Sequence, residues 1–106
     1  MMSTTEKLCA AITAIPGVEI GSSRFGSGSN PAWLVAGHEF AHLHSASLID
    51  LRLPRPLQAT LRADPRAHFR TGRSEWLELE FHSPADIRKI ATLARQAAAA
   101  ARAKSK

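Results

Sequence analysis

The sequence predicts a small α+β domain in which an antiparallel sheet of about five or six short strands carries helices packed on one face. The 106 residues are enough for one domain, since domains mostly run from about 50 to 250 residues. Several short segments alternate apolar and polar side chains and are separated by turn residues, as in antiparallel strands. The order helix, strands, helix, strands, helix favours a sheet covered on one side.

Composition agrees with a folded globular domain. Hydrophobic residues make up 44% and charged residues 22%, which excludes wholesale disorder and collagen-like repeats. No apolar run approaches the roughly 18 residues of a membrane-spanning helix. The first residues lack the pattern of a secretory signal, and Cys9 is the single cysteine. We therefore expect no membrane span and a cytoplasmic location.

The N-terminal third predicts one helix and one strand. Ser3 and Glu6 have the spacing of a capping box, and the apolar stripe that follows indicates a helix ending at Pro16. Residues 18–20 alternate as a short strand. Residues 21–31 are rich in glycine and serine, which favours an exposed loop.

Three further segments in the middle of the chain, 33–36, 39–44 and 48–53, alternate as strands. The alternation predicts that one face of these strands is apolar and belongs to the core. The other face then collects a different set of side chains: Phe40, His42, His44 and Asp50.

The second half of the chain repeats this pattern. Prolines precede a short helix around 57–62, and strands are predicted at 67–70 and 76–82. The last of these strands has the clearest alternation in the chain. Its leucines and phenylalanine point one way, and its other side chains point the opposite way: Trp76, Glu78, Glu80 and His82.

The C-terminal helix is predicted by a second capping box, Ser83 to Asp86, with Pro84 at the first helical position. The alanines of residues 97–101 keep helix propensity high but offer little to bury. We therefore predict a domain over residues 1–97 and a basic, frayed tail over 98–106.

The positive charge is unevenly distributed. The net charge is +5, yet residues 1–83 hold eight basic and eight acidic side chains, so the excess lies in residues 84–106. Cations are favoured near a helix C-terminus and a basic tail improves solubility. A solvated tail is the preferred interpretation, and contact with nucleic acid or acidic lipid is the weaker one.

The polar sheet face has an unusual density of titratable groups. His42 and His44 lie two apart on one strand, so their Cβ atoms are about 7 Å apart on one face. With Asp50, Glu78 or His82 as a third ligand they could hold zinc or non-haem iron. Alternatives are an organic-ligand or proton-transfer site and a plain polar surface. His-x-His is a short motif, so we assign no metal.

Several of these residues lie in segments that resemble a known family. The most distinctive segment is residues 39–44, followed by Asp50-Leu51, a proline and the helix start at Pro84. With Gly17-Val18-Glu19, Arg24-Phe25-Gly26 and Trp76-Leu77, these segments resemble the luciferase-domain family over about residues 12–97. That family is a small module of mostly bacterial proteins that also occurs in fungal luciferases.

The resemblance implies an activity for the domain. Fungal members oxidise a hydroxylated pyrone with molecular oxygen and use no dedicated organic cofactor. A luciferase-like, oxygen-dependent oxidoreductase is therefore one expectation, with a small aromatic or pyrone-like ligand. The candidate catalytic residues are His42, His44 and Asp50. The candidate ligand-binding residues are Glu39, Phe40, Trp76, Glu78 and His82.

A second function stays open at this point. The same face could belong to a non-catalytic protein-interaction module, in which the histidines are ordinary polar surface. Exposed sheet edges could also pair two copies of the chain as a homodimer. A flat face would favour the interaction module, and a concave face would favour the small-molecule site.

Overall fold

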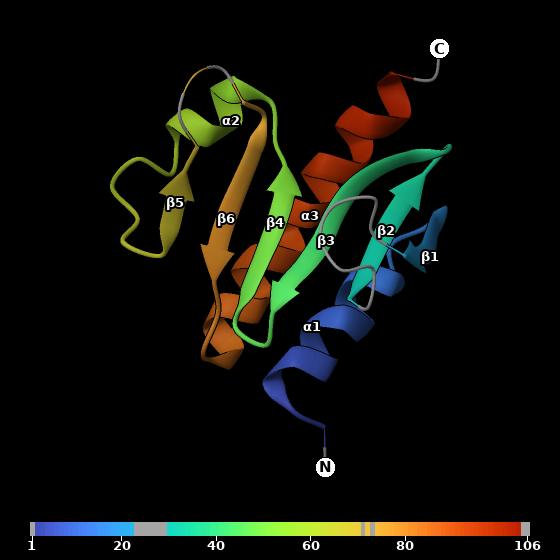
Figure 1. Ribbon diagram of the computed structural model, residues 1–106, viewed down its shortest axis with the longest axis horizontal. Coiled ribbons are helices and arrows are strands. Elements are labelled where there is room, and N and C mark those ends of the chain that lie inside the picture. Colours follow the sequence, from blue (N-terminus) through green and yellow to red (C-terminus); the bar gives the residue numbers. More distant parts are fainter. Residues whose placement is uncertain (1, 23–29, 71, 73, 105–106) are drawn as a thin grey trace.

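The computed structural model describes residues 2–22, 30–70, 72 and 74–104 (Figure 1). It confirms the α+β class with a six-stranded antiparallel sheet in the order β1-β2-β3-β4-β6-β5. The elements follow the chain as α1 (Thr4–Thr13), β1 (Val18–Ser22), β2 (Pro31–Val35), β3 (His38–Ser45), β4 (Leu48–Arg52), α2 (Arg55–Ala59), β5 (Ala67–Phe69), β6 (Trp76–Glu80) and α3 (Pro84–Ala103).

Helices α1 and α3 lie side by side behind the sheet, and α2 connects β4 to β5 at one end (Figure 1). Both predicted capping boxes form. The Ser3 hydroxyl accepts a hydrogen bond from the backbone N–H of Glu6, at 3.1 Å, and Ser83 accepts one from Asp86, at 3.3 Å. Local sequence signals therefore set where the two long helices begin.

The hydrophobic core fills the space between the helices and the sheet. Trp33 is fully buried there, and its indole N–H donates to the Thr13 hydroxyl at 3.0 Å. The other large, fully buried core side chains come from every part of the fold: Leu8, Ile12, Phe40, Ile49, Leu51, Leu53 and Leu77. Trp33 is thus a packing residue, and its one polar atom is satisfied.

Helix α3 is longer than the sequence predicts. It continues to Ala103, past residue 98, where the frayed tail is expected to begin. Ala98 and Ala101 are buried, because their small side chains let the helix approach its neighbours closely. Two cations fasten the last turn: Arg102 donates to the Pro16 carbonyl at 2.7 Å, and Lys104 lies 3.4 Å from a Glu75 oxygen.

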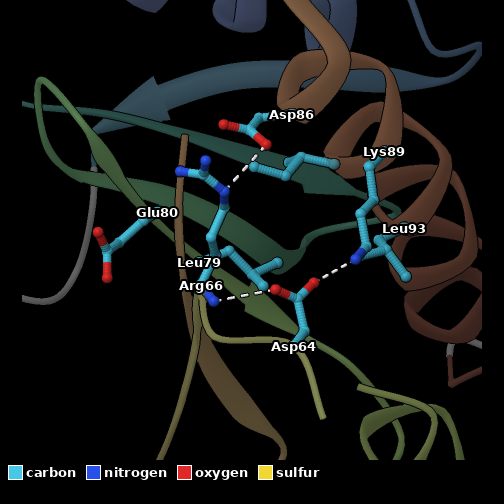
Figure 2. A pocket seen from close by; sticks show the side chains of 8 residues that line it. Asp64, Arg66, Leu79, Glu80, Asp86, Lys89 and Leu93 are labelled. Atoms are coloured by element: carbon cyan, nitrogen blue, oxygen red, sulfur yellow. Dashed lines mark hydrogen bonds and ion pairs between the residues drawn. The ribbon is translucent and has the colours of Figure 1, made fainter. Parts of the chain in front are cut away.

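Two ion pairs attach the segment before β5 to α3 (Figure 2). Arg66 lies 3.2 Å from an Asp86 carboxylate oxygen, and Lys89 pairs with Asp64. These pairs line a small cavity of about 80 Å³, in which both cations, Arg66 and Lys89, face a carboxylate. The pairing holds the outer strand against the first turns of α3.

Strand β3 contains two register shifts. Trp33 and Leu34 of β2 pair with Ala41 and Glu39, which leaves Phe40 as an extra residue. Such a bulge changes which side chains share a face. Phe40 is fully buried in the core, so its predicted place beside His42 on the polar face is wrong.

A second shift falls near the end of β3. Leu43 and Ser45 pair with Ile49 and Leu48 of β4, so His44 is the extra residue. Bulges often occur beside functional sites because they redirect a side chain.

The remaining sequence expectations are met in part. The turn before β3 is Ala36-Gly37, with positive φ angles of 53° and 82°. Most of the predicted glycine- and serine-rich loop lies outside the described residues. Among the described helices, none has the length and apolar character needed to cross a membrane.

Candidate functional site

Strand pairing aligns four titratable residues in one row across the sheet. His42 of β3 is paired with Asp50 of β4, Asp50 with Glu78 of β6, and Glu78 with His68 of β5. Side chains that are directly paired lie on the same side of a sheet. Because the neighbours of His42 and Asp50 along their strands belong to the core, the row lies on the face away from α1 and α3.

Asp50 is the buried centre of this row. Its carboxylate is inaccessible to solvent, with Oδ2 2.8 Å from His42 Nε2 and Oδ1 3.4 Å from the Arg70 guanidinium. The other ring nitrogen of His42, Nδ1, lies 3.0 Å from a Glu39 oxygen. The His42 ring is therefore held between two carboxylates. The first bulge of β3 makes this possible, because regular alternation would place Glu39 and His42 on opposite faces.

These contacts shift both pKa values in the direction of an ion pair. Burial alone would lower the pKa of His42, but the hydrogen bond and charge of Asp50, together with Glu39, raise it above its ordinary value. Burial alone would raise the pKa of Asp50, but His42 and Arg70 lower it. Both nitrogens of His42 thus face carboxylates that favour its protonated form, which suits it to hold Asp50 in place.

Trp76 packs against this pair. Its ring centroid lies 4.8 Å from that of His42, and the ring planes are tilted by 41°. A cation beside an indole is stabilised by the electron-rich ring. Trp76 is partly exposed, so it also offers aromatic surface next to the buried pair.

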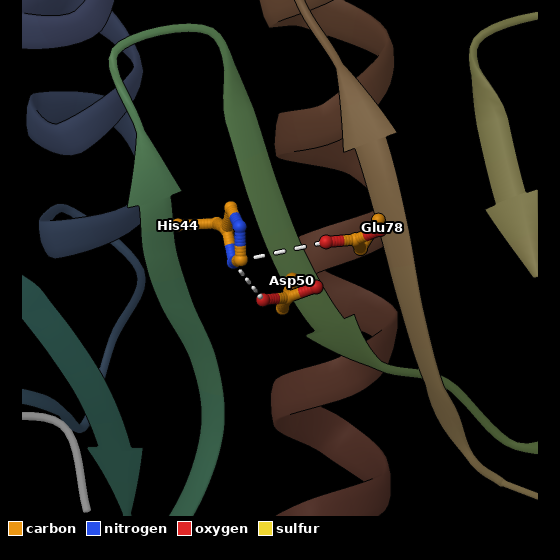
Figure 3. Close-up of side chains that lie close together, drawn as sticks. All are labelled: His44, Asp50 and Glu78. Atoms are coloured by element: carbon orange, nitrogen blue, oxygen red, sulfur yellow. Dashed lines mark ion pairs between the residues drawn. The ribbon is translucent and has the colours of Figure 1, made fainter. Parts of the chain in front are cut away.

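His44 is placed differently from His42. Its Nδ1 lies 3.5 Å from Asp50 Oδ2 and 3.7 Å from Glu78 Oε2 (Figure 3). Half of the side chain, 51%, is exposed, and no described residue makes a polar contact with Nε2. One nitrogen of His44 therefore faces two carboxylates, while the other has no polar partner among the residues that the structure describes.

The same three residues are the described set that could hold a metal ion. One ligand atom each from His44, Asp50 and Glu78 lie within 4.8 Å of one another. The predicted pairing of two histidines on one ion is not what the geometry favours, because both nitrogens of His42 already face carboxylates. One imidazole and two carboxylates would suit zinc or non-haem iron.

His82, a predicted ligand-binding residue, lies apart from this cluster. It follows β6, and its Nε2 is 3.2 Å from Glu80 Oε1, while His68 contacts the other Glu80 oxygen. These two histidines lower the pKa of Glu80. The two neighbouring glutamates therefore face different histidines: Glu80 faces His68 and His82, and Glu78 faces His44.

Sequence reasoning missed Arg70. It follows β5 and supplies the cation nearest the second oxygen of Asp50, twenty residues away along the chain. Alternation within 67–70 does not reveal this contact, because it depends on β5 pairing with β6 at the sheet edge. The signal in the sequence was Asp50 itself, because an aspartate on a predicted strand needs a cationic partner if it is buried.

A comparison with protein families connects this geometry to a known domain. The family model described as Luciferase domain matches residues 37–97, more than half of the chain. The match begins at the turn before β3 and contains His42, His44, Asp50 and Arg70, while the similar segments near residues 17 and 24 fall outside it. No curated protein matches the chain. The chain belongs to the luciferase-domain family.

Proposed function

We propose that this sheet face binds a small aromatic or pyrone-like molecule carrying an acidic hydroxyl group, and that His44 exchanges a proton with that hydroxyl. The observation that carries the proposal is the environment of the His44 ring. Its Nδ1 lies 3.5 Å from the buried Asp50 carboxylate, and its side chain is half exposed. A buried carboxylate behind one imidazole nitrogen favours proton uptake at the other.

The chemical step is a proton transfer. Nε2 of neutral His44 accepts the proton of a phenolic or enolic hydroxyl. The imidazolium that forms is stabilised by the carboxylates of Asp50 and Glu78, which lie 3.5 and 3.7 Å from Nδ1. The ligand is left as an anion with an electron-rich ring.

His42 acts as a positioning residue in this proposal. With Arg70, it keeps Asp50 ionised and fixed in the sheet, so that the carboxylate facing His44 does not need to reorganise. Trp76 lies beside the pair and supplies a face against which a flat ligand can pack. Glu39, on the far side of the His42 ring, holds that ring in orientation.

The family supports a further step in the same direction. Its fungal members, as the resemblance implies, oxidise a hydroxylated pyrone with molecular oxygen. An enolate is the form of such a ring that gives electrons to oxygen, so deprotonation at His44 would prepare the ligand for oxidation without an organic cofactor. We propose this oxidation as the activity, with ligand binding as its first requirement.

The test is a titration with hydroxylated pyrones and phenolic acids, followed by ¹H–¹⁵N correlation spectra that include the histidine side chains. We expect shifts at His44 and Trp76, and a loss of affinity of about tenfold or more in His44→Ala. The matched control is His68→Ala, because that side chain is 48% exposed and also faces a carboxylate. Equal loss in both variants would refute the assignment of His44.

Oxygen consumption is measured for every ligand that binds. If a ligand binds at His44 but no oxygen is consumed, the binding proposal stands and the oxidation is wrong. If nothing in the series binds and partner proteins shift the same resonances, the interaction-module alternative is favoured.

A further inference from the structure

A second cavity lies between α2 and the end of β5, with a volume of about 160 Å³. Of the seven described residues that line it, three are arginines and none is acidic; they are Arg55, Gln58, Ala59, Arg62, Phe69, Arg70 and Gly72. No part of the candidate site described above, apart from Arg70, belongs to it. The total charge of the sequence gives no sign of this cluster, because basic and acidic side chains balance over residues 1–83.

The charges of these arginines are poorly compensated. Arg55 donates to the Gly72 carbonyl at 2.9 Å, and among the described residues neither Arg55 nor Arg62 has an ion pair. Arg70 has the buried Asp50 carboxylate at 3.4 Å. The cavity beside α3 in Figure 2 differs, because there each cation faces a carboxylate.

Like charges that converge on one cavity repel each other, and an anion in the cavity relieves that repulsion. Guanidinium groups are suited to this role, since their planar array of donors matches the oxygens of carboxylate and phosphate. Phe69 lies at the same cavity and its side chain is 42% exposed. Its ring can pack against an apolar group attached to the anion.

We propose that this cavity binds the carboxylate or phosphate group of a small anionic molecule through Arg55, Arg62 and Arg70, with Phe69 against an attached ring. The inference does not depend on proton transfer at His44. Arg70 joins the two regions, because its guanidinium lines the cavity and also faces Asp50. An anion in the cavity therefore lies next to the cation that holds the buried carboxylate.

The experiment titrates the full chain with inorganic phosphate, phenyl phosphate and benzoate at constant ionic strength, followed by calorimetry and amide spectra. We expect saturable binding with shifts around Arg62 and Phe69. Arg62→Gln should weaken binding about fivefold or more, since it removes one charge-assisted contact. The matched control is Arg88→Gln, which removes the same charge from an exposed position on α3.

Two further variants separate the parts of the proposal. Phe69→Leu should weaken phenyl phosphate and benzoate but leave inorganic phosphate unchanged. His44→Ala should leave all three affinities unchanged, which distinguishes this cavity from the site of proton transfer. Thermal unfolding of each variant confirms that it is folded. The preference between phenyl phosphate and benzoate identifies the anionic group.

Three results would overturn the proposal. The first is equal weakening in Arg62→Gln and Arg88→Gln, which would mean that binding follows net charge alone. The second is the absence of saturation in the millimolar range. The third is displacement of phosphate by duplex DNA or RNA with a steep salt dependence that Arg62→Gln leaves unchanged, which would mean a diffuse polyanion surface.

Discussion

Replacing Asp50 with asparagine should reveal how strongly the buried pair stabilises the domain. Asp50 is fully buried between His42, at 2.8 Å, and Arg70, at 3.4 Å, so its removal leaves two cations facing a neutral amide. Breaking a buried ion pair by removing one partner costs about 3–5 kcal/mol. We expect a value near the lower limit, about 3 kcal/mol, because the amide oxygen can still accept a hydrogen bond.

The loss of unfolding free energy in Asp50→Asn should depend on pH in a defined direction. The pKa of His42 is raised on folding, so its stabilising contribution is complete below the ordinary histidine value and is lost as pH rises through the raised value. The pKa of Asp50 is lowered, so its contribution is complete above the ordinary aspartate value and is lost as pH falls through the lowered value. The difference between wild type and Asp50→Asn should therefore be largest between about pH 4 and 6.5.

The assay is urea unfolding followed by tryptophan fluorescence at pH 5.5 and at pH 9. Asp50→Asn, His42→Gln and the double variant form a cycle that isolates the coupling between the two side chains. We expect the coupling to be larger at pH 5.5 than at pH 9. A difference below about 1 kcal/mol, or one that is the same at both pH values, would refute the ion-pair interpretation.

Three other predictions concern the rest of the molecule. Gly17→Ala should destabilise the domain more than Gly37→Ala. Both glycines have positive φ, which costs alanine about 1–2 kcal/mol, but a Cβ at Gly17 would also lie 2.6 Å from the Arg102 guanidinium and disturb its hydrogen bond to the Pro16 carbonyl. Equal shifts in melting temperature would contradict this anchoring of α3. Burial raises the pKa of Cys9, so iodoacetamide at pH 8 should alkylate it more slowly than a free cysteine peptide, and equal rates would be evidence against burial. The proposed proton transfer uses no metal, so EDTA should leave pyrone binding unchanged; a loss restored by zinc or iron would favour His44, Asp50 and Glu78 as metal ligands.

The parts of the fold that the sequence predicted correctly depend on local signals. Two capping boxes and one strict alternation, at 76–82, were sufficient to locate α1, α3 and β6. Each of these signals lies within a few residues of the structure it determines. The alanines near the C-terminal end of α3 were misjudged as offering little to bury. Helix propensity says nothing about packing, and small alanine side chains allow the close packing that buries Ala98 and Ala101.

The candidate site was harder to predict because it depends on strand pairing. Strict alternation placed Phe40 beside His42, but the first bulge of β3 turns Phe40 into the core and lets Glu39 reach the His42 ring. The position of a bulge is set by how β3 fits against β2, and the residues of β3 alone do not encode it. Arg70 was missed for the same reason, since its contact with Asp50 requires the outer strands to be in register.

The two histidines of the His-x-His motif show why chemistry follows from partners and not from residue type. In the sequence, His42 and His44 were equivalent candidates on one strand. In the fold, two carboxylates occupy the nitrogens of His42, whereas the second bulge of β3 leaves His44 half exposed with one nitrogen facing Asp50. The burial that makes Asp50 a strong partner for both rings also requires His42 and Arg70 to compensate its charge. His42 therefore holds the Asp50 carboxylate in place, and the same carboxylate faces His44 Nδ1, where it can stabilise a proton on that ring.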